Sequence, residues 1–189
     1  MISGNIMIVG VGGQGTLVAS RLLGKLFDKA GYDVKMSEVH GMSQRGGSVV
    51  TYVRFGEKVY SPIISTGEAD FIVAFEKIEA ARYVDYLKTN GTVIVNSRER
   101  EPMPVTIGLA KYPHEILNEM AEEGIDIDSL DALKLAQQAG SDKAVNMVLM
   151  GRLSKYFNFP EEDWIDALKA SVKPATYEIN EEAFRLGRE

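Results

Sequence analysis

The sequence predicts a single three-layer α/β/α domain, built on a mainly parallel sheet with an inserted antiparallel hairpin. Short apolar runs alternate along the chain with segments of helical periodicity, which is the pattern of an α/β protein. The first apolar run ends in a glycine-rich turn that leads into a helical segment. Because the chain has 189 residues and 45% of them are hydrophobic, one domain spanning 1–189 can bury a substantial core.

The amino-terminal forty residues predict a Rossmann-like βαβ unit. Residues 6–9 form a short apolar strand. Residues 32–37 form a second strand, directly after Gly31, a residue type that suits the end of a helix. Between the two strands, apolar side chains recur on one helical face at Ala19, Leu22, Leu23, Leu26, Phe27 and Ala30.

The inserted hairpin is predicted from the segment that follows. Residues 48–55 alternate in polarity, which places Val49, Val53 and Phe55 on one face of a strand. Gly56 then stands where a type II′ turn requires glycine. Residues 58–61 would form the returning strand.

The rest of the chain continues the alternation of strands and helices. We expect further strands over residues 69–75, 92–95, 105–107 and 125–127. We expect helices over residues 76–87, 113–123, 128–139, 142–157, 160–171 and 180–189, with Asn90 and Gly91 closing the first of them.

Charge and hydropathy exclude two classes of partner. The formal net charge is −6, and the chain has no basic stripe that could follow a phosphate backbone, so nucleic acid is not an expected partner. No apolar run approaches the roughly 18 residues of a membrane span, and the amino-terminal segment lacks the basic residues of a signal peptide. We therefore expect a cytoplasmic protein without a membrane partner.

The sequence contains no cysteine and only two histidines, His40 and His114. The absence of cysteine excludes disulfides, a thiol nucleophile and cysteine-ligated zinc or iron–sulfur sites within this chain. Because the histidines lie far apart in the sequence, we expect no metal site. No residue is identified as catalytic.

The first candidate site is the glycine loop after the first strand. Gly10, Gly12 and Gly15 match the pattern G-x-G-x-x-G between a strand and a helix. Glycine lets the backbone approach a ligand closely, and the free amides at the start of the helix attract a pyrophosphate. The predicted cradle consists of Gly10, Gly12, Gly13, Gln14, Gly15 and Thr16.

The glycine loop is open to more than one interpretation. Glu38 lies 23 residues beyond Gly15, roughly where NAD enzymes carry the acid that binds the ribose. The turn could also serve only close packing of helix against strand. A phosphate-loop NTPase is excluded, because Thr16 and Leu17 stand where that motif requires Lys and Ser or Thr.

A second polar loop follows the second strand, at the sheet edge where such folds bind ligands. Arg45 offers a planar fork of donors that suits phosphate or carboxylate. Glycines beside it would let a ligand or a partner approach the backbone. The candidate residues for contact with a ligand or a partner subunit are His40, Ser43, Gln44, Arg45, Gly46 and Gly47.

The two loops together carry a resemblance to a known family. GVGGQG spans residues 10–15, SEVHGMSQRGGSVVTYVRFG spans 37–56 and VYSP spans 59–62. NMVLMGRLSKYF at 146–157 and NEEAFRLG at 180–187 extend the similarity over nearly the whole chain. With these motifs the chain resembles the gamma-type subunit or domain of 2-oxoacid:ferredoxin oxidoreductases, and most of all the beta subunits that serve indolepyruvate.

The resemblance implies a reaction and a division of labour. The reaction is oxidative decarboxylation of a 2-oxoacid, here an aryl pyruvate such as indolepyruvate, to an acyl-CoA with reduction of ferredoxin. Thiamine diphosphate and iron–sulfur clusters are expected in a large partner subunit, so this chain should not be active alone and should meet ferredoxin only indirectly. Gly12, Gly13, Gln14 and Gly15 would then contact the phosphates of coenzyme A.

Two alternatives remain open. The glycine loop and Glu38 are also compatible with a stand-alone NAD-type dinucleotide-binding or regulatory module. The same subunit role could serve pyruvate, 2-oxoglutarate or a branched-chain 2-oxoacid, because the oxoacid pocket would lie elsewhere. A subunit should leave an apolar surface patch on the isolated chain, which could also make the isolated chain a homodimer.

Overall fold

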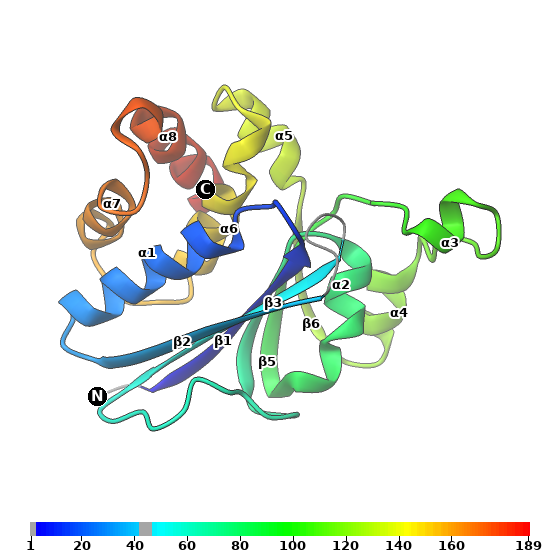
Figure 1. The fold of residues 1–189 in the computed structure, drawn as a ribbon, viewed down its shortest axis with the longest axis horizontal. Helices are drawn as coiled ribbons and strands as arrows, with labels where there is room; N and C mark the ends of the chain where they lie inside the picture. The colour runs from blue at the N-terminus through cyan, green and yellow to red at the C-terminus, as the bar shows by residue number, and fades with distance from the viewer. Residues whose placement is uncertain (1–2, 42–46) are drawn as a thin grey trace.

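Strand β1 (Gly4–Val11) lies inside a six-stranded sheet in the order β2-β3-β1-β4-β5-β6 (Figure 1). The computed structural model describes residues 3–41 and 47–189. The other strands are β2 (Asp33–His40), β3 (Ser48–Gly56), β4 (Ala69–Ala74), β5 (Leu87–Asn96) and β6 (Asp126–Leu130). Strands β1, β4, β5 and β6 pair in parallel, so the predicted α/β class with a mainly parallel sheet is confirmed.

The antiparallel element differs from the predicted hairpin. Strand β3 is antiparallel to both β1 and β2 and lies between them. Because both of its edges are paired, no edge remains for a returning strand, and residues 58–61 form none. The carboxylate of Asp33 instead accepts the backbone amide of Val59 at 3.0 Å, which holds this segment at the start of β2.

Helices cover both faces of the sheet (Figure 1). Five lie on one face: α1 (Thr16–Lys29), α5 (Ala132–Gln138), α6 (Val145–Ser154), α7 (Glu161–Lys169) and α8 (Tyr177–Arg188). On the other face lie α2 (Lys77–Arg82) and α4 (Ile116–Glu122). No helix in residues 3–41 and 47–189 is long and apolar enough to cross a membrane.

The continuous apolar run in β1 follows from burial on both faces. Ile6 and Ile8 enter the core beneath α1 and α6, whereas Met7 and Val9 enter the core beneath α2. All four side chains are fully buried. A strand covered on both sides needs apolar residues at every position, which is why residues 6–9 show no alternation.

Three local predictions are wrong. Residues 128–130, predicted to begin a helix, are the end of β6, and α5 begins only at Ala132. Residues 105–107, predicted as a strand, belong largely to the short helix α3 (Met103–Thr106). Pro102 and Pro104 suit the first turn of a helix, and no strand of residues 3–41 and 47–189 pairs with this segment. Asn90 and Gly91, predicted to end a helix, lie within β5, where Asn90 takes a positive φ of 64°.

Helices α6 and α8 cross in direct backbone contact. A Cβ atom at Gly151 would overlap the carbonyl oxygen of Phe184 on α8, and one at Gly187 would overlap the carbonyl oxygen of Val148 on α6. Only glycine lets the two helices approach this closely. This crossing holds the carboxyl-terminal helix onto the domain.

We expect Gly151→Ala to lower the free energy of unfolding by about 3 kcal/mol, because the new methyl group meets backbone that cannot move aside. Gly24→Ala in α1 is the matched control, since its Cβ would meet only the flexible end of Met36. That change should alter stability by less than about 1 kcal/mol. Urea unfolding of both variants checks this, and equal stabilities would contradict it.

Candidate functional site

The candidate site lies at the sheet edge where β1 and β4 end. Strand β1 leads into α1 on one face, whereas β4 leads into α2 on the other face. Neighbouring parallel strands whose connections diverge in this way leave a crevice at their carboxyl ends, which is the usual ligand position in open α/β sheets. The backbone amide of Phe75 donates to the carbonyl oxygen of Val9 at 2.9 Å, so the two strand ends are fixed to each other.

The glycine loop turns the chain from β1 into α1 within a few residues. Gly13 and Gly15 have φ values of 94° and 85°, a region that favours glycine. The side-chain oxygen of Gln14 accepts the amide of Val11 at 2.6 Å, and this oxygen fills the space that a Cβ at Gly10 would need. The amide of Gly12 donates to the carbonyl oxygen of Gly47 at 2.9 Å.

The start of α1 is free to attract an anion. Gly15 is its N-cap residue, with no side-chain cap and no acidic residue in the first turn. Among the described residues, the amides of Gly13, Gly15 and Thr16 find no hydrogen-bond acceptor. A helix of 14 residues with an uncapped amino terminus offers these donors together with the positive end of its dipole.

A cavity of about 590 Å³ opens above this helix start. Its size is typical of small-molecule sites. Gly13, Gln14 and Gly15 line it together with residues 141–146, where α6 also starts without a side-chain cap or an early acid. The segment 171–180, between α7 and α8, forms a further wall.

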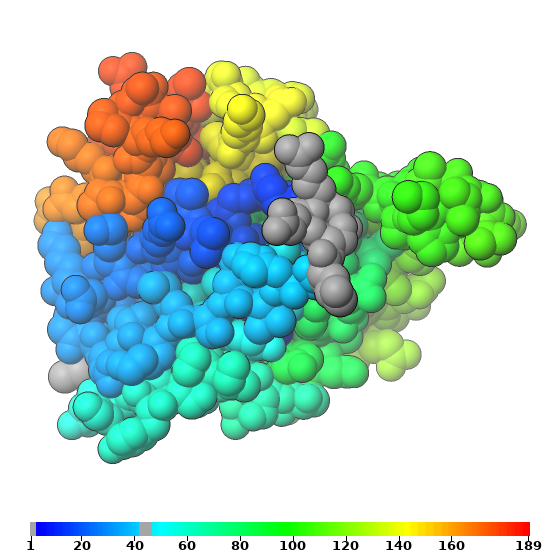
Figure 2. Space-filling model, viewed as in Figure 1, coloured from blue at the N-terminus to red at the C-terminus, as the bar shows by residue number. Residues whose placement is uncertain are grey.

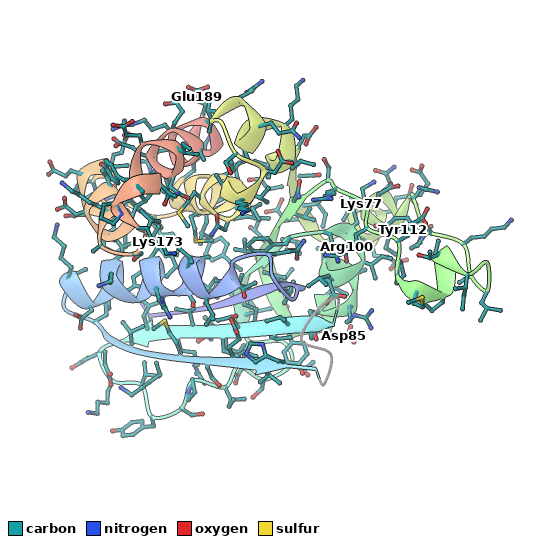
Figure 3. All side chains as sticks on the ribbon, turned by 45° about the horizontal axis from the view of Figure 1, so that its top comes forward. Lys77, Asp85, Arg100, Tyr112, Lys173 and Glu189 are labelled. Atoms are coloured by element: carbon teal, nitrogen blue, oxygen red, sulfur yellow. The ribbon has the colours of Figure 1, made fainter. Side chains whose placement is uncertain are left out.

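Four basic side chains make this cavity positive: Arg21, Arg98, Lys143 and Lys173. All four are exposed to solvent, and none forms an ion pair within the part of the chain that the structure describes. Asp142 is the one carboxylate among the lining residues. Figure 3 shows Lys173 at the border between α1 and the carboxyl-terminal helices. The arrangement suits a ligand with several phosphates.

Two buried amides hold the walls of the cavity together. The side-chain amide of Asn146 donates to the carbonyl oxygen of Gly15 at 3.3 Å, which joins the start of α6 to the start of α1. A Cβ at Gly15 would lie 2.8 Å from the same amide nitrogen. Asn96 donates to the carbonyl oxygen of Phe75 at 3.2 Å and accepts the amide of Ala132 at 3.1 Å.

The structure divides the predicted cradle. Gly13, Gln14 and Gly15 line the cavity, whereas Gly10, Gly12 and Thr16 lie outside its lining. Gly10 and Gly12 belong to the turn, and Thr16 is a buried residue at the start of α1. The four basic residues come from four segments far apart in the sequence, so no sequence motif identifies them together. One signal was available, because Arg21 follows the motif by little more than one helical turn.

Glu38 does not occupy the position expected of a ribose-binding acid. Its carboxylate accepts the hydroxyls of Thr16 and Thr51 at 3.0 and 2.9 Å, and it pairs with His40 at 2.9 Å. Only 8% of its side chain is exposed. Because β3 separates β2 from β1, the acid lies one strand further from the glycine loop than in a dinucleotide-binding βαβ unit. Glu38 therefore joins β2, β3 and α1.

The second predicted loop is described only at its ends. Ser43, Gln44, Arg45 and Gly46 lie outside the described residues. His40 pairs with Glu38, and Gly47 accepts the amide of Gly12. At the exit, the hydroxyl of Ser48 hydrogen-bonds the buried carboxylate of Glu79. Both ends of the loop are therefore attached beside the candidate site.

An arm formed by residues 98–112 extends from the body next to the site, as Figure 2 shows in green at the right. At its base, Glu99 accepts hydrogen bonds from Lys77 and pairs with His114, each at 2.8 Å. The hydrogen bond from Lys77 lowers the pKa of Glu99. Burial is the main reason that the pKa of Tyr112 is raised, and the negative charges of Glu76 and Glu99 raise it further. Lys77, Arg100 and Tyr112 gather at this base in Figure 3.

The tip of the arm is apolar and exposed. Met103, Ile107 and Leu109 are 70%, 57% and 79% exposed. No charged residue occurs in the stretch 102–110. Exposed apolar side chains that gather on a projecting segment are typical of a protein–protein contact.

No group of three or more potential ligands among the described residues is arranged to hold a metal ion. The sequence supplies no cysteine. The groups that the described residues offer at this site are backbone amides and basic side chains, which suit an anion.

Comparison with known proteins gives concordant matches. Residues 5–189 match the family model described as "Pyruvate ferredoxin/flavodoxin oxidoreductase". The indolepyruvate oxidoreductase subunit IorB of Thermococcus kodakarensis is 48% identical over 188 residues, which cover 97% of this chain and 93% of that protein. The 2-oxoglutarate synthase subunit KorC of Methanothermobacter marburgensis is 32% identical over 190 residues, which cover 97% of this chain and 94% of that subunit.

A solved structure shows the same fold. The 2-oxoglutarate:ferredoxin oxidoreductase from Magnetococcus marinus, with 2-oxoglutarate, coenzyme A and succinyl-CoA bound, superposes with a TM-score of 0.76 at 21% identity. The match covers 100% of this chain and 31% of that chain.

We expect Thr51→Val to lower the free energy of unfolding by about 2 kcal/mol, because it removes one donor to the buried charge of Glu38. Thr106→Val, on the exposed arm, should change stability by less than about 0.5 kcal/mol. A double-mutant cycle with Glu38→Gln isolates the coupling between Thr51 and Glu38. Additive effects in thermal unfolding would show that the hydroxyl does not stabilise this carboxylate.

Proposed function

The chain belongs to the pyruvate ferredoxin/flavodoxin oxidoreductase family, and we propose that it is the coenzyme-A-binding subunit of a 2-oxoacid:ferredoxin oxidoreductase. The complete enzyme would convert an aryl pyruvate such as indolepyruvate to the acyl-CoA with reduction of ferredoxin. Thiamine diphosphate and the iron–sulfur clusters would reside in a large partner subunit.

The positive cavity at the glycine loop is the observation that carries this proposal. Coenzyme A has a pyrophosphate and a separate phosphate on its ribose. The amides of Gly13, Gly15 and Thr16 suit the pyrophosphate, and the basic side chains around the cavity suit the remaining charge. The related enzyme from Magnetococcus marinus is itself described with coenzyme A bound.

The roles of this chain's residues are binding and orientation. Gly13, Gly15 and Thr16 would hold the phosphates through backbone amides, and Asn146 would keep those amides aimed into the cavity. Thiamine diphosphate, when bound in the partner, supplies the group that stabilises the carbanion left by decarboxylation. This chain contains no cysteine to ligate a cluster, which is consistent with placing the clusters in the partner.

The substrate class rests on the relatives. Identity is 48% to a subunit named for indolepyruvate and 32% to one named for 2-oxoglutarate. This difference supports an aryl pyruvate over 2-oxoglutarate. The four basic side chains of the described cavity suit phosphates, which an oxoacid such as indolepyruvate does not carry. We therefore place recognition of the oxoacid in the partner subunit.

The arm supports a role as a subunit. Its exposed tip of Met103, Ile107 and Leu109 would leave apolar surface in water on an isolated chain. The base of the arm is fixed by Lys77, Glu99 and His114 and lies at the same sheet edge as the cavity. A partner that covers the cavity would therefore also reach the arm.

The stand-alone NAD-binding alternative has lost its main support. It depended on Glu38, whose carboxylate already accepts hydrogen bonds from Thr16 and Thr51 and pairs with His40. A ribose would have to displace these partners.

The double substitution Lys143→Ala and Lys173→Ala should raise the KM for coenzyme A at least about tenfold in the assembled enzyme, since each loses a charge-assisted contact. The KM for the oxoacid should stay within about twofold. Steady-state kinetics with each substrate varied in turn measures both. Lys25→Ala on α1, which does not line the cavity, is the matched control.

An unchanged KM for coenzyme A, with assembly intact, would reject the cavity as the phosphate site. Arg45→Ala tests the second loop in the same assay. A raised KM indicates phosphate contact, whereas an assembly defect alone indicates a subunit interface.

Replacing Met103, Ile107 and Leu109 together by Ser should weaken association with the large subunit while the chain stays folded, because these side chains make no core contacts. Co-expression followed by size-exclusion chromatography with light scattering measures complex formation. Tyr60→Ser, at a side chain that is 90% exposed outside the arm, should leave it unchanged. Full assembly of the triple variant would remove the arm from the interface. Loss of a self-associated form of the isolated chain would assign the arm to a homodimer.

A further inference from the structure

A second cavity lies at the opposite end of the sheet from the glycine loop. It has a volume of about 380 Å³ and opens where β1 and β4 begin, beside the segment that joins α6 to α7. Figure 1 shows the start of β1 at this end of the sheet. The coenzyme A site proposed above does not include any of its lining residues.

Aromatic residues make up half of the lining of this cavity. The six aromatic residues are Tyr32, Phe55, Phe71, Tyr156, Phe157 and Phe159. They come from several segments of the chain, and consecutive rings are in contact: Phe71 lies 5.2 Å from Tyr156 and 5.6 Å from Phe157 between ring centroids. Tyr32 contacts Phe55 edge to face at 5.5 Å. The rings thus form a continuous surface.

Several of these rings remain partly open to water. Tyr156 is 42% exposed, and Tyr32, Phe71, Phe157 and Phe159 are only partly buried. Tyr32, Phe157 and Phe159 pack on the fully buried Phe27, which fixes these three rings in place. A preformed apolar wall of this kind favours a flat ring, because the ligand removes apolar surface from water without reordering the protein.

The charge at the mouth restricts the ligand further. Asp70 is the one charged residue of the lining, and no basic side chain lines the cavity. Its Oδ2 accepts the amide of Asn5 at 2.7 Å, and its Oδ1 pairs with Lys88. Because 46% of the Lys88 side chain is exposed, this amine can turn into solvent when a ligand cation takes its place. An aryl carboxylate would find no basic side chain in the lining and would be repelled by the carboxylate of Asp70.

We propose that this cavity is a second ligand site that binds a small aromatic amine. The ring lies against Phe71, Phe157 and Phe159, and the ammonium group lies at Asp70. The attraction combines ring stacking, cation–π contact and one charge-assisted hydrogen bond. The two cavities therefore select opposite charges: phosphates at the glycine loop and an aromatic cation at the far end of the sheet.

Calorimetric titration of the full chain with three probes of matched shape tests this site. 2-Phenylethylamine should bind most tightly, 2-phenylethanol about tenfold more weakly and phenylacetate more weakly still. Asp70→Asn keeps an acceptor for the amide of Asn5 and should reduce the affinity for the amine to that for the alcohol. Phe159→Ala should weaken both ligands about tenfold. Tyr60→Ala, an exposed aromatic outside the cavity, should change neither affinity.

Thermal unfolding confirms that each variant remains folded before it is titrated. Absence of heat with all three probes would overturn the proposal. It would also be overturned if the amine bound the Asp70→Asn and Phe159→Ala variants as tightly as the unmodified chain. The probes contain no phosphate, so the result is independent of whether coenzyme A binds at the glycine loop.

Discussion

The arrangement of the whole domain depends on one tight turn at the end of β1. The chain must leave a strand that is buried on both faces and enter α1 within a few residues, between the start of β3 and the end of β4. Gly10 leaves room for Gln14 and Phe75, and Gly15 leaves room for Asn146. A Cβ at these positions would push α1 away from the sheet. Within the described residues, the amides of Gly13, Gly15 and Thr16 at this turn have no hydrogen-bond acceptor, so the turn that allows close packing also presents donors that suit an anion.

Local periodicity predicted most of the helices and strands. It could not predict which strands pair with one another in the sheet. The apolar run before Gly10, the stripe along α1 and the cap at Gly31 indicated a βαβ start, and the structure has one. The insertion of β3 between β1 and β2 is a non-local choice, and the alternation in residues 48–55 is the same whichever strands lie beside it. The helix at 103–106 was missed because a β-branched run outweighed the prolines beside it.

The candidate site was predicted only where its residues are consecutive. The glycine motif was visible because turn, strand and helix follow one another. Arg98, Lys143 and Lys173 come together through folding and carry no shared sequence pattern. The chain has a net charge of −6, yet four basic side chains surround one cavity. The net charge of the sequence therefore could not predict the positive potential at this cavity. Sequence spacing suggested that Glu38 could bind a ribose. Spacing alone cannot show that its carboxylate accepts hydrogen bonds from the hydroxyls of Thr16 and Thr51.

Hydrogen exchange on the assembled complex tests most directly whether the glycine loop holds the phosphates of coenzyme A. The complex is compared with coenzyme A and with pantetheine, which has the same thiol arm but no nucleotide phosphates. If the amides of Gly13, Gly15 and Thr16 bind phosphate, coenzyme A should slow exchange in the peptides that cover this loop, and pantetheine should not. Equal exchange in this loop with both compounds would contradict the assignment and place the nucleotide elsewhere in the complex.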